Sequence, residues 1–173
     1  MGAEQLVILA YDPRWPREFE RLRQRALTVL GDLAVGVEHV GSTAVPGLAG
    51  KPVIDLDIVV SSPEDVTVAF ARLATVGYER EGRSGVVAAA DGLTAAHWPR
   101  GERRHHLYIV IAGSRVHRER LAFRDYLRAH PEQTQCYADL KLHAAHDAAG
   151  DWEGYAQLKQ QFVRRVLRAA LAT

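Results

Sequence analysis

The chain has 173 residues, 47% of them hydrophobic and 25% charged, and its 22 basic residues nearly balance 21 acidic ones for a net charge of +1. This predicts one compact domain, residues 1–173, and excludes a general electrostatic attraction to nucleic acid or membranes. One cysteine, Cys136, excludes an internal disulfide, and we expect it to be buried or half-buried. The absence of an apolar run of membrane-spanning length and of a basic N-terminal flank indicates a cytoplasmic protein.

The first part of the chain carries clear helix and strand patterns. Apolar residues from Trp15 to Leu33 recur at steps of three and four, which predicts an amphipathic helix. Residues 35–40 and 53–60 are rich in β-branched side chains and predict two strands joined by a connection with glycine and proline. Residues 63–75 predict a second helix. Over residues 77–101 we expect short strands and a hairpin, without assigning their ends.

Another strand follows this weaker region. Over His105–Ile111 the side chains alternate between two faces, so that His106 and Tyr108 share one of them. Ser114 comes shortly after the strand and is suited to cap the next helix. The last third predicts three helices, over residues 117–130, 132–147 and 152–171.

The order of these elements favours one fold class. Strands and helices do not alternate regularly, so a mixed sheet is favoured over a doubly wound parallel one. We therefore expect an α+β fold with a small mixed sheet and flanking helices. The sheet belongs to a core over about residues 1–113, and the helical C-terminal part covers about residues 114–173.

Two acidic residues lie inside the apolar run of the second predicted strand. Asp55 and Asp57 are two residues apart, so their carboxylates point to the same side of a strand. Neighbouring anions among apolar side chains repel each other unless a cation lies between them. Magnesium prefers such oxygen ligands, which predicts a Mg²⁺ site at these two residues. The alternative is a solvated or capping pair.

A Gly-Ser turn precedes this strand. Gly41, Ser42 and Thr43 offer backbone N–H groups and hydroxyls to phosphate oxygens, and Lys51 offers a positive charge. A phosphate-binding turn followed by two metal-binding carboxylates is suited to phosphoryl or nucleotidyl transfer. The alternative is that Gly-Ser is an ordinary turn. His39 either orients this turn or packs in the core.

The predicted C-terminal helices carry basic residues and histidines that are further candidates for a binding site. Arg124 and Arg128 lie one turn apart and either clamp a phosphate or form a solvated stripe. His143 and His146 have a spacing that permits metal binding, but a surface position is favoured. The arginines of the last predicted helix, Arg164, Arg165 and Arg168, are expected on a solvated face.

The block from His39 to Asp57, HVGSTAVPGLAGKPVIDLD, resembles the signature of the GrpB family, a branch of the nucleotidyltransferase superfamily with a polymerase-β-type fold. This resemblance implies a small mixed sheet that carries the Gly-Ser and Asp-x-Asp elements. It also implies relatedness to a domain fused to dephospho-coenzyme A kinase in some bacteria. Further segments resemble the family: YDPRWP at 11–16, His106-Leu107, Gly113-Ser114, FRDYLR at 123–128, Tyr137, Leu140-Lys141, Tyr155 and Lys159.

The resemblance implies further site residues, and the chain also departs from the expected pattern on one strand. It implies that Lys141, Tyr155 and Lys159 border the cleft, with Lys141 among the phosphate-binding residues. Active nucleotidyltransferases usually carry a third carboxylate on a neighbouring strand, but this chain has His106 and Tyr108 there. Family members commonly show His-Leu-His at this place, so Tyr108 replaces a second histidine. His106 is either a ligand or catalytic base, or a hydrogen-bonded structural group.

Two functions follow from these residues and the resemblance. The first is a magnesium-dependent nucleotidyltransferase-like protein that transfers or binds a nucleotide, with Asp55, Asp57 and His106 as catalytic residues and an undefined acceptor. The second is a noncatalytic module that binds a nucleotide or a coenzyme A-related molecule, favoured by the missing third carboxylate. A nucleic-acid partner is disfavoured by the near-neutral charge.

Overall fold

A five-stranded mixed sheet is the centre of the computed structural model, which describes residues 7–80, 93–97, 99, 104–147 and 152–172. The strand order is β1-β2-β5-β4-β3. β2 and β5 are parallel, and every other neighbouring pair is antiparallel. The α+β class with a mixed sheet is thus confirmed. The strands are β1 Gly36–Val40, β2 Ile54–Val60, β3 Glu79–Arg80, β4 Leu93–His97 and β5 His105–Ile111.

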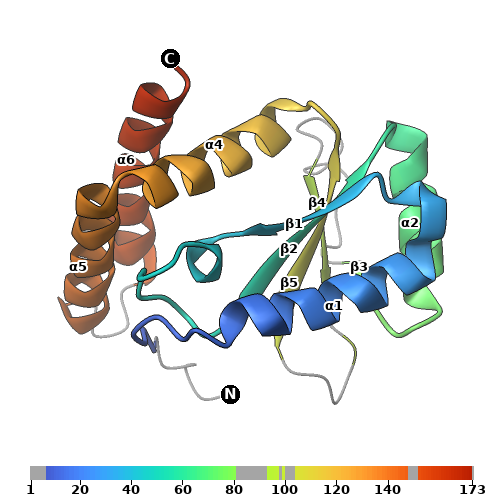
Figure 1. Cartoon of the computed structure of the whole chain (residues 1–173), viewed down its shortest axis with the longest axis horizontal. Coiled ribbons are helices and arrows are strands. Elements are labelled where there is room, and N and C mark those ends of the chain that lie inside the picture. Colours follow the sequence, from blue (N-terminus) through green and yellow to red (C-terminus); the bar gives the residue numbers. More distant parts are fainter. Residues whose placement is uncertain (1–6, 81–92, 98, 100–103, 148–151, 173) are drawn as a thin grey trace.

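One face of the sheet is apolar and is covered by two helices. α1 (Trp15–Leu30) and α2 (Pro63–Ala74) pack on this face, and a 3₁₀ turn, η1 (Gly31–Leu33), follows α1 (Figure 1). The predicted first helix ends earlier than expected, because Gly31 takes a positive φ of 54° that stops the α-helical turn. The core includes Leu30, Leu56, Ile58, Leu73, Leu107 and Ile109.

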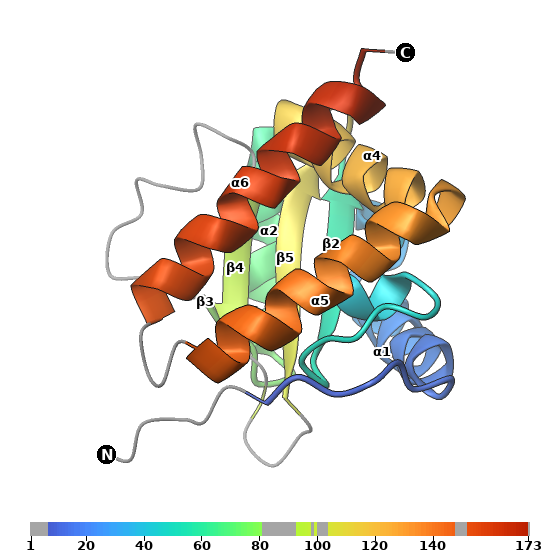
Figure 2. The same ribbon diagram turned by 90° about the vertical axis from the view of Figure 1, so that its left-hand side faces the viewer.

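The other face of the sheet is covered by the C-terminal helices. α4 (Arg115–Ala129) crosses this face, while α5 (Pro131–Asp147) and α6 (Trp152–Ala170) lie side by side at one end of the molecule (Figures 1 and 2). Ser114 caps α4 as predicted, since its hydroxyl accepts from the backbone N–H of His117. Pro131 begins α5, in keeping with the tolerance of proline in a first helical turn.

A second apolar cluster lies between the C-terminal helices and the connection that follows β1. It includes Val45, Leu48, Leu127, Tyr137, Phe162 and Val166. Cys136 is exposed, so the expectation of a buried or half-buried thiol was wrong. Its neighbour Tyr137 takes the buried position of α5, together with Ala138 and Lys141 at helical spacing, which turns Cys136 outward.

The weakly patterned region from 77 to 101 contributes β3 and β4, in line with the expected short strands. β4 pairs with both β3 and β5. The rest of the expected hairpin falls largely outside the described residues. In the part of the chain that the structure describes, no helix is both long and apolar enough to cross a membrane.

Candidate functional site

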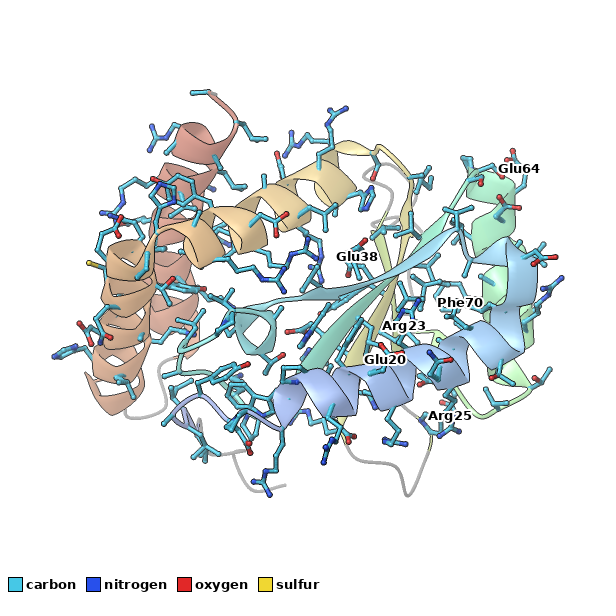
Figure 3. All side chains as sticks on the ribbon, viewed as in Figure 1. Glu20, Arg23, Arg25, Glu38, Glu64 and Phe70 are labelled. Atoms are coloured by element: carbon cyan, nitrogen blue, oxygen red, sulfur yellow. The ribbon has the colours of Figure 1, made fainter. Side chains whose placement is uncertain are left out.

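Acidic and polar side chains gather on the sheet face under α4. Glu38 of β1 lies directly across from Asp57 of β2, which in turn lies across from Tyr108 of β5. In the same way Asp55 lies across from His106. Residues directly opposite in paired strands point to the same face, and Glu38 points from β1 toward α4 in Figure 3. The sheet register therefore brings three carboxylates to one face.

Asp55 and His106 are in direct contact. His106 Nδ1 lies 2.8 Å from Asp55 Oδ1. A carboxylate accepts hydrogen bonds only, so the proton is on Nδ1 and the nitrogen donates. This leaves Nε2 of the same ring as an acceptor when the histidine is neutral. The predicted partners of the site, Asp55 and His106, are thus brought together.

Asp57 has a different partner, Arg120 of α4. The side chain of Asp57 is 0% exposed, and that of Arg120 is 26% exposed. Arg120 Nε donates to Oδ2 at 2.7 Å and Nη2 donates to Oδ1 at 2.8 Å, which is a bidentate pair. Burial raises the pKa of Asp57, and the guanidinium of Arg120 opposes that shift. For Arg120, burial acts to lower the pKa, but the attraction of Asp57 outweighs it and raises the pKa above its ordinary value.

The Gly-Ser turn forms a short 3₁₀ helix, η2 (Ser42–Ala44), directly after β1. Gly41 has a positive φ of 72°, and a Cβ at this position would lie 2.1 Å from Asp55 Oδ2. The turn therefore needs glycine here for two reasons, backbone conformation and close approach to the carboxylate. Gly41 therefore lies directly against Asp55, and both residues line the same cavity as Ser42.

Ser42 is bonded to a buried lysine. Lys141 Nζ donates to Ser42 Oγ at 2.9 Å and to the backbone carbonyl of Ala49. It also lies 4.6 Å from the centre of the Tyr137 ring, and the residue is 2% exposed. Among the described residues no carboxylate pairs with this ammonium group. Burial, together with the nearby charge of Lys159, lowers the pKa of Lys141 to about 7.

Thr43, also predicted to bind phosphate, points into the protein. It is buried, and its Oγ1 lies 3.0 Å from His39 Nε2. The His39 ring stacks on Phe19 with centroids 4.5 Å apart, which matches the core-packing alternative for this histidine. Burial lowers the pKa of His39 to about 4, with smaller contributions in the same direction from Arg128 and Arg124 and an opposing one from Asp55. His39 is therefore neutral at pH 7.

Arg124 and Arg128 hold the turn from the side of α4. Arg124 Nη1 donates to Glu38 Oε2 at 2.8 Å and to the carbonyl of His39 at 3.1 Å. Arg128 donates twice to the carbonyl of Ala44, at 3.0 and 2.8 Å. Neither arginine lines the cavity described next. In this arrangement both guanidinium groups bind protein oxygens, and their role as phosphate ligands stays a prediction.

A cavity of about 280 Å³ lies between the polar sheet face, α4 and α6. Three predicted site residues, Gly41, Ser42 and Asp55, lie on its wall, and Lys159 reaches it from α6. The Lys159 position was implied by the family resemblance. The lining consists of Val40, Gly41, Ser42, Asp55, Glu119, Arg120, Phe123, Tyr137, Lys159, Val163 and Leu167.

Other candidates lie elsewhere. Lys51 is half-buried and does not line this cavity. His143 is exposed and bonds the carbonyl of Asp139 at 2.7 Å. The side chains of His146 and Tyr155 lie outside the described residues. Three arginines of α6 are exposed, as expected for a solvated face: Arg164, Arg165 and Arg168.

The carboxylates of Asp55 and Asp57, in this arrangement, do not fit the predicted magnesium ion. Both oxygens of Asp57 already accept hydrogen bonds from Arg120, and one oxygen of Asp55 accepts from His106. Within the described residues no group of three or more His, Cys, Asp or Glu side chains is placed to hold a metal. A metal shared by Asp55 and Asp57 stays a prediction, and it would need Arg120 to move.

Three residues of the site were not predicted from the sequence: Arg120, Glu38 and Tyr137. A signal existed for Arg120, because it lies four residues before Arg124 and continues the predicted stripe by one turn. To predict Glu38 as a site residue, one would have to know which strand pairs with β2. Tyr137 was a family-like residue, but its place under Lys141 depends on the packing of α5.

The arrangement of strands and helices is that of the nucleotidyltransferase fold. A solved structure of the Cid1 poly(U) polymerase has a TM-score of 0.54 with this chain at 13% identity, covering 82% of this chain and 44% of that one. The likeness at this identity concerns the fold.

Closer relatives identify the family. The model of the family described as GrpB protein matches residues 5–169, and the chain belongs to the GrpB family. A UPF0157 protein of Halalkalibacterium halodurans is 35% identical over 168 residues, which cover 97% of this chain and 84% of that protein. The crystal structure of the conserved protein GrpB from Enterococcus faecalis has a TM-score of 0.82 at 30% identity, covering 96% of this chain and 98% of that one.

Proposed function

We propose that this protein binds a nucleotide through its phosphates in the cavity beside Ser42, as a binding module with the nucleotidyltransferase fold. The observation that carries the proposal is Lys141, a buried ammonium that donates to Ser42 Oγ and has no carboxylate partner among the described residues. An unpaired buried cation is costly unless an anion approaches it. Lys141 does not itself line the cavity, but it bonds Ser42 of the cavity wall, and a phosphate bound at Ser42 would bring an anion next to it.

The rest of the cavity suits the same ligand. Lys159 adds a second positive charge, and the turn at Gly41 and Ser42 adds backbone N–H groups and a hydroxyl. Phe123 and Val163 provide apolar wall for a base or another flat group. A ligand with several phosphates and an apolar end therefore matches the lining better than a small inorganic anion does.

Titration calorimetry with ATP, UTP and coenzyme A tests this proposal. We expect at least one of them to bind, and Lys141→Met to weaken binding roughly 10-fold to 100-fold, because a hydrogen bond to a charged group is worth about 1.5–3 kcal/mol. Arg164→Met, an exposed arginine of α6, is the matched control and should bind like the wild type. Lys51→Met tests the separate prediction that Lys51 contacts phosphate.

The pH dependence gives a second readout. With a pKa of about 7, Lys141 is charged below pH 7, and a bound phosphate would raise its pKa further. Affinity should therefore stay level below pH 7 and fall as the pH rises above it, and Lys141→Met should lack this part of the dependence. The absence of binding by every probe, or equal affinity in the wild type and Lys141→Met, would contradict the proposal.

Metal-dependent nucleotidyl transfer is the second candidate. It is favoured by the contact of Asp55 with His106 at the cavity wall, and one structure of the Cid1 polymerase is described as bound to MgATP. In this candidate Asp55 and Asp57 would bind magnesium, which would offset charge on the phosphates. Incubation with labelled ATP or UTP and Mg²⁺ tests it: label in any product supports transfer, and label only in unreacted nucleotide removes it.

A further inference from the structure

The environment of Asp57 indicates whether its carboxylate binds an arginine or a metal ion. Its carboxylate is fully buried, and both oxygens accept hydrogen bonds from Arg120 at 2.7 and 2.8 Å. Each oxygen keeps a second lone pair, but the carboxylate is 0% exposed with the guanidinium of Arg120 against it, and a divalent cation placed there would be repelled by the charge of that guanidinium. Asp57 can therefore serve Arg120 or a metal, but not both in the same geometry.

Arg120 is held in place from a second side. Its guanidinium carbon lies 4.5 Å from the centre of the Tyr108 ring, which faces it from β5. Tyr108 is the register partner of Asp57, so the carboxylate and the aromatic ring stand side by side beneath α4. A guanidinium over an aromatic face gains a cation–π attraction in addition to the ion pair. Asp57 and Tyr108 together thus suit the guanidinium of an arginine rather than a metal ion.

Arg120 also reaches the cavity. It is one of the lining residues together with Ser42 and Asp55, and about a quarter of its side chain is exposed, 26%. A guanidinium carries five N–H donors, and two of them are used on Asp57. The remaining donors are available to an anion at the cavity wall, where planar N–H pairs suit phosphate oxygens.

We infer that the guanidinium of Arg120 is the cation that Asp57 binds in this site, in place of a metal ion. It keeps Asp57 from coordinating a divalent metal and offers its free N–H groups to the phosphate of the ligand, so the ligand binds without Mg²⁺. The role of Arg120 toward a phosphate rests on the proposed function, whereas the exclusion of metal from Asp57 does not.

Binding of Mn²⁺, followed by the electron paramagnetic resonance of the free ion, tests the exclusion on the full chain. We expect wild type and the control Arg118→Met, an exposed arginine of the same helix, to bind Mn²⁺ equally weakly. Arg120→Met frees both oxygens of Asp57 and should bind Mn²⁺ at least tenfold more tightly. Adding Asp57→Asn to Arg120→Met should return the affinity to the wild-type value. Wild type that binds as tightly as Arg120→Met overturns the inference.

Arg120→Met leaves a buried carboxylate unpaired. If this variant does not fold, the comparison of wild type with Asp57→Asn decides. Equal Mn²⁺ affinity in these two proteins supports the inference, and weaker binding by Asp57→Asn overturns it.

Nucleotide titrations in a buffer with EDTA and in a buffer with Mg²⁺ test the second part of the inference, that Arg120 contacts the phosphate and the ligand binds without Mg²⁺. We expect the nucleotide affinity to agree within twofold in the two buffers and to fall at least tenfold in Arg120→Met. Binding that requires Mg²⁺ overturns the inference and leaves the proposed function standing. If no nucleotide binds in either buffer, the proposed function fails, and with it the role of Arg120 toward phosphate, while the Mn²⁺ experiment still decides whether Asp57 is closed to metal.

Discussion

His39 is a buried histidine that the fold keeps neutral. Its ring is stacked on Phe19 and bonded to Thr43, and burial lowers its pKa to about 4. In the unfolded chain the same group titrates near its ordinary pKa of about 6.5. Between these two values the unfolded state binds a proton that the folded state does not, so the folded state loses stability as the pH falls from 6.5 toward 4.

This gives a prediction for acid stability. A shift of this size corresponds to about 3 kcal/mol, since one pKa unit is worth about 1.4 kcal/mol. Urea unfolding at pH 7 and pH 4.5 should show a smaller loss of stability in His39→Gln than in wild type. His143→Gln, at an exposed position, is the control. The same loss in wild type and His39→Gln would contradict a low pKa for His39.

Ser42 and Thr43 show how much of a residue's role can be predicted locally. Both belong to the turn that the sequence predicted as a phosphate site, and both carry a hydroxyl. In the 3₁₀ turn Ser42 lies at the cavity wall, whereas Thr43 is buried against His39. The sequence indicates that a turn is present, but the direction of each hydroxyl depends on how the turn packs on α1 and α5.

At the scale of elements, α4 is attached to the sheet and to the turn η2 by three arginines at a spacing of four residues. Arg120 binds β2, Arg124 binds β1, and Arg128 binds η2. The spacing places all three on one side of the helix, and each bonds a different segment of the site. α4 thus positions the turn and the acidic strand relative to each other.

Arg128→Met tests this role. It removes two hydrogen bonds to the carbonyl of Ala44, and the residue is partly exposed, so we expect a loss of about 1–2 kcal/mol in the free energy of unfolding. Arg128 bonds Ala44, which does not line the cavity, whereas Lys141 bonds Ser42, which does, so nucleotide affinity should change less than in Lys141→Met. Urea denaturation and calorimetry measure the two effects. A larger loss of affinity than in Lys141→Met would instead indicate that Arg128 contacts phosphate.

Among the elements, the long ones were predicted best. The helices corresponding to α1 and α2 and the strands β2 and β5 were predicted within a few residues at their ends, because an apolar period repeats along each of them. β3 and β4 had no assigned ends, since they are two and five residues long in a region rich in glycine and alanine. A short strand is defined by its partner more than by its own pattern.

At the scale of the whole molecule, the described residues form two apolar clusters, and the site lies between them. One cluster packs α1 and α2 on the sheet, and the other packs α4, α5 and α6 on the connection after β1. Phe162 of α6 stacks on Tyr137 at 4.6 Å, and Tyr137 in turn supports Lys141. The C-terminal helices therefore contribute to the site through packing as well as through Lys159.

Phe162→Ala tests the coupling of this second cluster to the site. Removing a buried aromatic side chain costs about 3–5 kcal/mol, and we expect the free energy of unfolding to fall by that amount. Nucleotide affinity should fall as well, because Tyr137 loses its neighbour. Leu158→Ala, at an exposed position of the same helix, should change stability by less than about 0.5 kcal/mol. Equal stability of the two variants would show that α6 is not part of the core.

The sequence by itself determined which side chains share a face. The alternation along residues 53–60 and 105–111 placed Asp55 with Asp57, and His106 with Tyr108, because side-chain direction in a strand is a local property of the backbone. Only the tertiary structure decided the partners. Arg120 bonds Asp57 from 63 residues away, and Lys141 bonds Ser42 from 99 residues away. Such pairs depend on how whole helices dock, which is set by the summed burial of two apolar clusters and by no local pattern.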